Sequence, residues 1–282
     1  MVGKFKRLFW LWIQCIISMR KVITLMPFLI YAILQVFLLY SLNNFSQSPF
    51  SSVLVPIVQK TFGEPALHYP NFYLVLTSMF SQINIILSGS IGIIFVGMAT
   101  YIFALNFRNN EIHFSEAFKI TITKYVVLFL IWVIVSALSF LMIMGLPIIL
   151  KKFFSQEYFL GRIFDLVGLL LGIVVTSMFS YTTVLVVLER KKILEVILNT
   201  FSIFFKNPGT SFFLIAIPTV FYFPISYLSR RIDLIFIKLS PESIVMILAI
   251  GIFITFISSY FQVGSITRFY LLLNEPRRYD YK

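Results

Sequence analysis

The sequence has little of the residue types that build catalytic and metal sites. It contains one cysteine, Cys15, and two histidines, His68 and His113, among 282 residues. A single cysteine cannot form an internal disulfide, so no oxidised framework holds the chain together. Acid–base and metal-dependent chemistry need clustered histidines, cysteines or carboxylates, and no phosphate-binding loop, dinucleotide fingerprint or zinc-protease motif appears. We therefore expect no catalytic residue, no cofactor and no metal ligand, and a protein that is not an enzyme.

Charge is also scarce, and apolar side chains take its place. Only 12% of the residues are charged and 59% are hydrophobic, with a mean hydropathy of +0.94. A soluble domain is roughly half apolar and a quarter charged. The composition therefore predicts an all-α integral membrane protein, a single transmembrane domain over residues 1–282.

Long apolar runs divide the chain into six expected transmembrane helices. A spanning helix needs about 20 largely apolar residues, because the hydrocarbon core is about 30 Å thick. Runs bounded by charges, prolines or turn residues place the spans near 22–42, 73–105, 125–150, 163–188, 209–228 and 243–272.

The distribution of basic residues predicts the orientation of these spans. Of the 23 Lys and Arg residues, 16 fall on the side of the N-terminus and 7 on the other. Cytoplasmic segments of membrane proteins carry the excess of positive charge. We therefore expect a protein of the cell inner membrane with both termini on the cytoplasmic side. His68 and His113 then fall on opposite sides, which excludes a shared site.

Three shorter segments, near 4–21, 111–124 and 191–206, precede the odd-numbered spans. Arg20 and Lys21 end the first, and neither can lie at the bilayer centre at an acceptable cost. Each segment has a narrow polar stripe at spacings of three and four, with apolar and aromatic residues elsewhere. This pattern predicts amphipathic interfacial helices on the cytoplasmic leaflet.

An interfacial helix followed by two spans would then occur three times along the chain, which suggests an internal repeat. The copies share pattern rather than identity. The alternative is that basic amphipathic segments simply accompany the inner side of any protein with an even number of spans.

The formal charge of +12 lies mostly beside apolar spans. Anionic lipid headgroups are therefore the expected partner, and no nucleic acid is expected. The candidate headgroup contacts lie on the cytoplasmic side: Arg20, Lys21, Lys119, Lys124, Lys191, Lys192, Lys206 and Arg268.

Polar side chains inside the spans are neutral rather than charged. Gln35, Asn84 and Gln262 are the candidates for an intramembrane polar site that holds a headgroup or small solute. The competing interpretation is that such groups hydrogen-bond between helices, at about 1 kcal/mol each. A Gly168–Gly172 pair matches the GxxxG spacing of close helix contacts.

One stretch resembles known families. The run from Val187 to Gly209, VLERKKILEVILNTFSIFFKNPG, is similar to a recurring block of six-span bacterial membrane proteins. The YciC-type proteins and the membrane domain attached to some glycerophosphodiester phosphodiesterases look similar, with an N-terminal amphipathic stretch like Phe5–Val22 and a third span ending in proline like Val126–Pro147. The resemblance implies a fold. It implies no activity, because the soluble catalytic domain of the phosphodiesterases has no counterpart in this sequence.

The sequence therefore predicts a non-enzymatic, lipid-contacting accessory subunit or organiser of a larger membrane protein complex. The alternative function is a carrier or scramblase for a lipid or amphipathic solute, with a groove lined by Gln35, Asn84 and Gln262.

Overall fold

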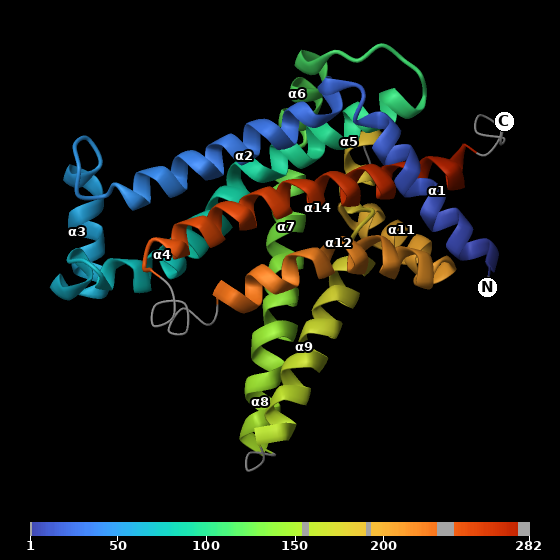
Figure 1. Cartoon of the computed structure of the whole chain (residues 1–282). Coiled ribbons are helices and arrows are strands. Elements are labelled where there is room, and N and C mark those ends of the chain that lie inside the picture. Colours follow the sequence, from blue (N-terminus) through green and yellow to red (C-terminus); the bar gives the residue numbers. More distant parts are fainter. Residues whose placement is uncertain (1, 154–157, 190–192, 230–239, 276–282) are drawn as a thin grey trace. The chain divides into compact units, whose positions relative to one another are not determined.

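A computed structural model describes residues 2–153, 158–189, 193–229 and 240–275, and within these ranges the secondary structure is helical (Figure 1). A search of the described residues finds six helical segments long and apolar enough to cross a membrane. Their bounds are Val22–Asn43, Asn71–Phe107, Tyr125–Leu150, Leu166–Glu189, Pro208–Ser229 and Ser243–Asn274. The prediction of an all-helical, multi-pass protein with six spans is confirmed at this level.

The contacts within the chain separate two compact units, and the prediction of one domain over residues 1–282 stays a prediction beside this division. Unit 1 comprises Met1–Pro27, Ile93–Pro218 and Tyr260–Lys282, and unit 2 comprises Phe28–Gly92 and Thr219–Ser259. Three helices contribute residues to both units: α2 (Val22–Asn43), α12 (Pro208–Ser229) and α14 (Ser243–Asn274).

Unit 1 holds the three short helices that the sequence places before the odd-numbered spans. Helices form at each position, as α1 (Val2–Ser18), α6 (Phe114–Thr123) and α11 (Ile193–Lys206). The other helices that lie wholly in unit 1 are α5 (Ile93–Phe107), α7 (Tyr125–Phe140), α8 (Leu146–Phe153), α9 (Tyr158–Met178) and α10 (Thr182–Val184).

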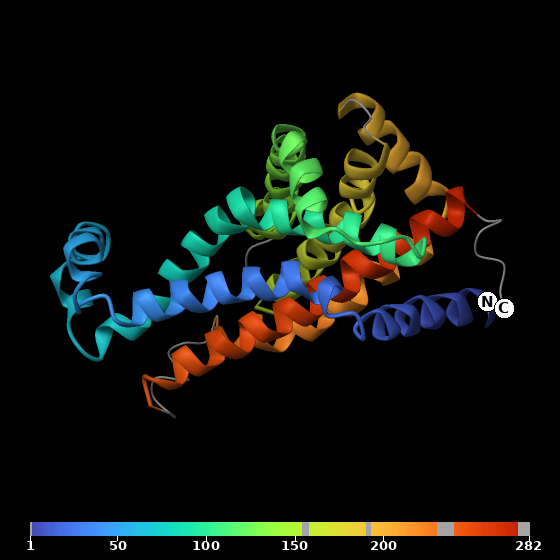
Figure 2. The same ribbon diagram turned by 90° about the horizontal axis from the view of Figure 1, so that it is seen from above.

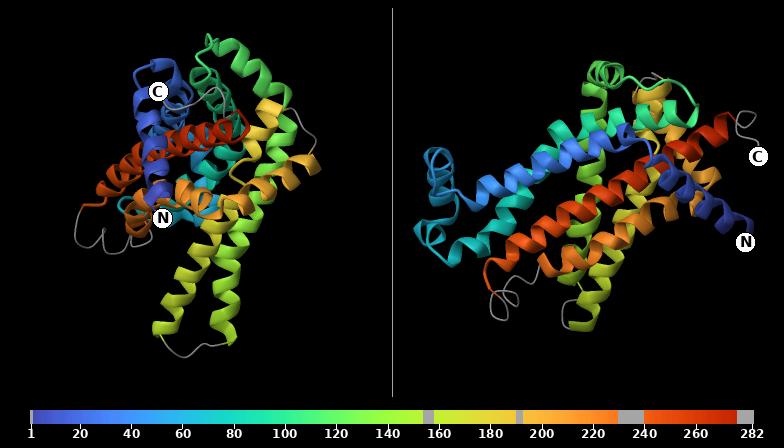
Figure 3. Two further views of the ribbon diagram at one scale, coloured as in Figure 1. Left: turned by 90° about the vertical axis from the view of Figure 1, so that its right-hand side faces the viewer. Right: turned by 45° about the horizontal axis from the view of Figure 1, so that its top comes forward.

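The third and fourth spans of the chain, which lie in unit 1, pack as an antiparallel pair, with α7 and α8 against α9 (Figure 3). Glycine makes the close approach possible. A Cβ atom on Gly172 would lie 2.5 Å from Cγ1 of Ile143, and one on Gly168 would lie 2.8 Å from the backbone oxygen of Met142. Larger side chains would push the helices apart, so the GxxxG spacing serves a contact within the chain.

Three spans contain a π-helical segment: η2 (Ser88–Gly92), η3 (Leu141–Gly145) and η4 (Leu185–Glu189). Such segments insert an extra residue into an α-helix. In the second span, η2 brings Gly92 against the ring of Tyr31 on α2, so that a Cβ atom there would lie 3.1 Å from Cζ of Tyr31.

Unit 2 contains helices that the span prediction left as a connection. Between the first and second spans the chain forms α3 (Ser51–Phe62) and the 3₁₀ turn η1 (Glu64–Leu67), and then enters α4 (Asn71–Leu87). These elements lie where α2 and α4 meet (Figure 2). Their apolar side chains join one buried cluster with both spans and the start of α14: Leu39, Leu42, Phe45, Val58, Ala66, Phe72, Leu76, Met79, Phe80, Ile244, Leu248 and Ile252.

Candidate functional site

Helix α11 has three distinct faces. Val196, Thr200 and Phe204 are buried, and their spacing of four places them along one side of the helix. Large apolar side chains are exposed along a second side, at Leu194, Leu198 and Phe205. Exposed polar side chains follow along a third: Glu195, Ser202 and Lys206. An exposed apolar stripe beside an exposed polar stripe suits a boundary between hydrocarbon and water.

Helix α6 repeats this arrangement. Ala117 and Thr121 are buried, and Ala117 packs with Met98 and Ile102 of α5. Phe118 and Ile122 are exposed apolar residues on the neighbouring side. Exposed polar residues occupy the remaining side: Ser115, Lys119 and Thr123.

Helix α1 differs in how it uses its polar side chains. The predicted stripe of Lys4, Arg7, Gln14, Ser18 and Lys21 includes residues that turn inward. Ser18 is buried and accepts a hydrogen bond from Nδ2 of Asn106 at 3.0 Å. The Arg7 guanidinium lies 5.0 Å from the centroid of the Phe269 ring. The exposed side of α1 is consequently apolar, with Phe9, Ile13, Ile16 and Ile17, and exposed Lys6 and Arg20 lie near its two ends.

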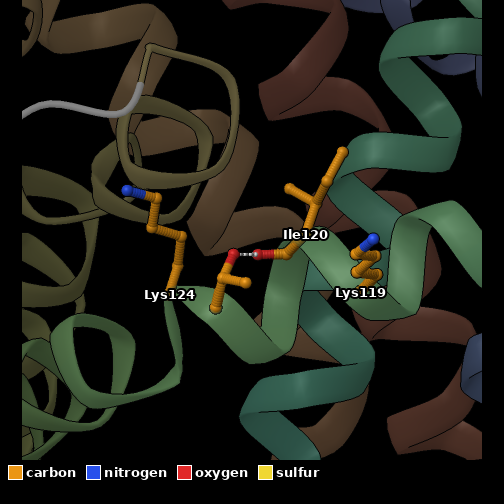
Figure 4. Close-up of a pocket in the computed structure, with 4 residues that line it drawn as sticks. Lys119, Ile120 and Lys124 are labelled. Carbon is orange, nitrogen blue, oxygen red and sulfur yellow. Dashed lines mark hydrogen bonds between the residues drawn. The ribbon is translucent and has the colours of Figure 1, made fainter.

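A small pocket lies against the junction of α6 and α7 (Figure 4). Among the described residues, Lys119, Ile120, Thr123 and Lys124 line it, around a volume of about 280 Å³. Figure 4 shows Ile120 between the two lysines, and the Thr123 hydroxyl donates to the backbone oxygen of Ile120 at 2.7 Å. Two predicted headgroup contacts, Lys119 and Lys124, thus line one pocket.

Arg268, another predicted headgroup contact, lies inside unit 1 with only 7% of its surface exposed. Its guanidinium is 5.1 Å from the centroid of Trp10 and 5.0 Å from that of Phe107. Nη1 of Arg268 also donates to the backbone oxygen of Phe107, at the end of α5, at 3.4 Å. In these contacts Arg268 joins α1, α5 and α14 through cation–π stacking and helix capping. The sequence missed this role, because charge alone does not indicate burial.

The structure describes three of the remaining five predicted headgroup contacts. Arg20, Lys21 and Lys206 are exposed. Lys191 and Lys192 lie outside the described residues.

The predicted intramembrane polar residues fall into two groups. Gln35 is 3% exposed, and its Nε2 donates to Oδ1 of Asn84 at 2.8 Å, both within unit 2. Gln262 belongs to unit 1, where its Nε2 lies 3.4 Å from the backbone oxygen of Ile215. The described contacts therefore bring Gln35 and Asn84 together and give Gln262 a different partner.

Three ionisable residues outside the spans, Cys15, Arg108 and Glu275, are buried or paired within the protein. Burial raises the pKa of the Cys15 thiol to about 12, and the nearby Arg268 charge acts in the opposite direction. Nη2 of Arg108 and Oε1 of Glu275 form an ion pair at 2.5 Å. Among the described residues, no group of three or more His, Cys, Asp and Glu side chains is placed to hold a metal ion.

Comparison with known proteins finds no match to this chain among protein-family models, curated proteins or solved structures.

Proposed function

We propose that this chain is a non-enzymatic, multi-pass protein of the cell inner membrane that contacts anionic lipids and serves as an accessory subunit or organiser of a membrane complex. Both termini and the helices α1, α6 and α11 would lie on the cytoplasmic side. Each helix would rest in the interface, where amphipathic helices bury an apolar face among acyl chains and keep basic residues near headgroups.

The observation that carries this proposal is the three-sided character of α11. One side packs against the protein, and Leu198, on the apolar side, is 68% exposed. Exposing the apolar side chains of Leu194, Leu198 and Phe205 to water would raise the free energy of the protein by roughly 25 cal/mol per Å² of apolar surface. In the membrane interface the same stripe contributes to binding, and the neighbouring Lys206 faces the anionic surface.

The carrier or scramblase alternative needs intramembrane polar groups that are available to a solute. Gln35 and Asn84 bind each other directly, which supports a role in packing two helices. No contact described above favours the alternative.

The proposal is tested by solubilising the native membrane gently and identifying by mass spectrometry the proteins and lipids that co-purify. An accessory subunit predicts a stoichiometric protein partner together with enriched anionic lipid. Charge reversal at Lys191, Lys192 and Lys206 should release lipid or partner, whereas Lys60→Glu, an exposed lysine on α3, should not. An unchanged lipid and partner profile after the triple reversal would count against the interfacial helices.

A further inference from the structure

We propose that the pocket at the α6–α7 junction binds one phosphate group, that of an anionic lipid, between Lys119 and Lys124. This inference rests on the proposed function and deepens it. It assigns a defined, saturable site to two lysines that otherwise would only take part in diffuse attraction to a charged surface.

The pocket is built on a helix that is held firmly in place. Thr121, on the buried side of α6, packs so closely against α5 that a Cβ atom on Gly97 would lie 2.5 Å from its Cγ2 atom. Ala117, one turn earlier, is completely buried. A site on a rigid helix loses less conformational entropy on binding than a site on a loop. The backbone that carries the two lysines is already ordered before a ligand binds.

The local charge favours an anion. Neither Lys119 nor Lys124 forms an ion pair with a carboxylate of the described residues. The nearest acidic residue along α6, Glu116, accepts a hydrogen bond from the hydroxyl of Tyr101 at 2.7 Å. The lining of the pocket therefore includes two lysines that no described carboxylate neutralises, and Figure 4 shows their ammonium groups on either side of Ile120. Binding one phosphate would draw these two flexible side chains toward each other.

The exposed apolar side of α6 indicates a lipid as the source of the phosphate. Phe118 and Ile122 are exposed, and the helical period places them across Lys119 from the side of Ile120 and Lys124. In the interfacial position proposed for α6, these side chains lie among acyl chains, so the pocket lies at the depth of lipid phosphates. The chemistry recognised is the same for both sources, and only a lipid is held at that depth.

The test measures acetylation of each lysine by mass spectrometry on the full-length protein in neutral detergent. The probes are dioctanoyl phosphatidate, dioctanoyl phosphatidylcholine and inorganic phosphate. At a phosphatidate concentration of about ten times Kd, acetylation of Lys119 and Lys124 should slow about tenfold. Lys60 is an exposed internal control, and its rate should not change. Phosphatidylcholine should protect much less.

A variant shows whether the two lysines act on the same ligand. In Lys119→Gln, phosphatidate at the same concentration should no longer protect Lys124, whereas the control variant Lys60→Gln should leave that protection intact. Loss of protection in both variants, or in neither, would contradict a joint site.

The other outcomes are equally decisive. Equal slowing at Lys60, Lys119 and Lys124, or no slowing at Lys119 and Lys124, overturns the site. Equal protection by inorganic phosphate overturns the lipid as the source. If the site fails while spin labels at Phe118 still report contact with acyl chains, the interfacial helices stand and only this inference falls.

Discussion

The side-chain amide of Gln35 on α2 donates a hydrogen bond to the side-chain oxygen of Asn84 on α4 at 2.8 Å. Gln35 is 3% exposed, and Asn84 is half-buried. In a membrane, where water cannot replace a lost partner, such a pair joins two helices at about 1 kcal/mol. The first prediction follows from this mutual dependence.

Replacing Gln35 by Leu leaves the Asn84 oxygen without this donor, so unfolding of purified protein in detergent should become easier by about 1 kcal/mol. Because the two side chains serve each other, Gln35→Leu/Asn84→Leu should cost less than the sum of the single variants. Gln82→Leu, at an exposed position on α4, is the control. Additive effects would show that the pair is not coupled.

The buried guanidinium of Arg268 gives a second prediction. Arg268→Lys keeps the charge but loses the planar group that lies against Trp10 and Phe107, so it should destabilise the protein by about 0.5–2 kcal/mol. The exposed Arg20→Lys should change stability by less than about 0.5 kcal/mol. Thermal unfolding in one detergent compares the two. Equal effects would show that stacking contributes nothing.

Cys15 should resist alkylation in the folded protein. Burial raises its pKa to about 12, so the reactive thiolate is nearly absent at pH 7–9. Because the folded-state pKa lies above the unfolded value, the stability contributed by the neutral thiol is present below the unfolded pKa and lost as pH rises toward 12. Maleimide should label native Cys15 slowly and denatured Cys15 fast. Arg20→Cys in a Cys15→Ala background should react quickly without denaturant, and similar rates at both positions would contradict the burial of Cys15.

Two glycines on α9 should be sensitive to size. Gly172→Val would collide with Ile143 and separate α9 from the third span, which should cost about 1–3 kcal/mol. Gly209→Val is the control, since a Cβ atom on Gly209 meets nothing within 4 Å. Trypsin resistance of the detergent-solubilised protein reports the difference. Equal resistance of the two variants would mean that the α7–α9 contact is loose.

The spans were predictable because lipid imposes a length and a composition on them. The predicted span 125–150 matches Tyr125–Leu150, and the span 22–42 ends one residue before Asn43. The fourth span is predicted from 163, but its helix, α9, begins at Tyr158, and the part apolar enough to cross a membrane begins at Leu166. An apolar pattern does not mark where a helix starts.

Other features left no usable signal in the sequence. Pro56 lies inside α3, and a proline normally argues against a helix interior. The π-helical segments η2, η3 and η4 lie within apolar runs that an ordinary α-helix would fit equally well. Spacing alone also did not show that the α1 stripe turns inward at Ser18, because its partner Asn106 lies far away in the chain.

The sequence also does not show which candidate polar residues pair with each other. The positions of Gln35 and Asn84 within apolar runs identify them as candidates, but the partner of each depends on which helices meet. Their charge identifies Lys119 and Lys124 as candidate headgroup contacts. The pocket beside them lies where α6 turns into α7, which charge does not predict.

The most direct test of the central claim is the depth of α11 in a bilayer. Nitroxide labels would be placed singly at Leu198 and at Glu195, in a Cys15→Ala background reconstituted into anionic vesicles. Both residues are exposed, on the apolar and polar sides of one helix. The account predicts that the label at Leu198 collides mainly with oxygen dissolved in the acyl chains, and the label at Glu195 mainly with a water-soluble nickel chelate. Preferential collision with the nickel chelate at both positions would contradict an interfacial α11.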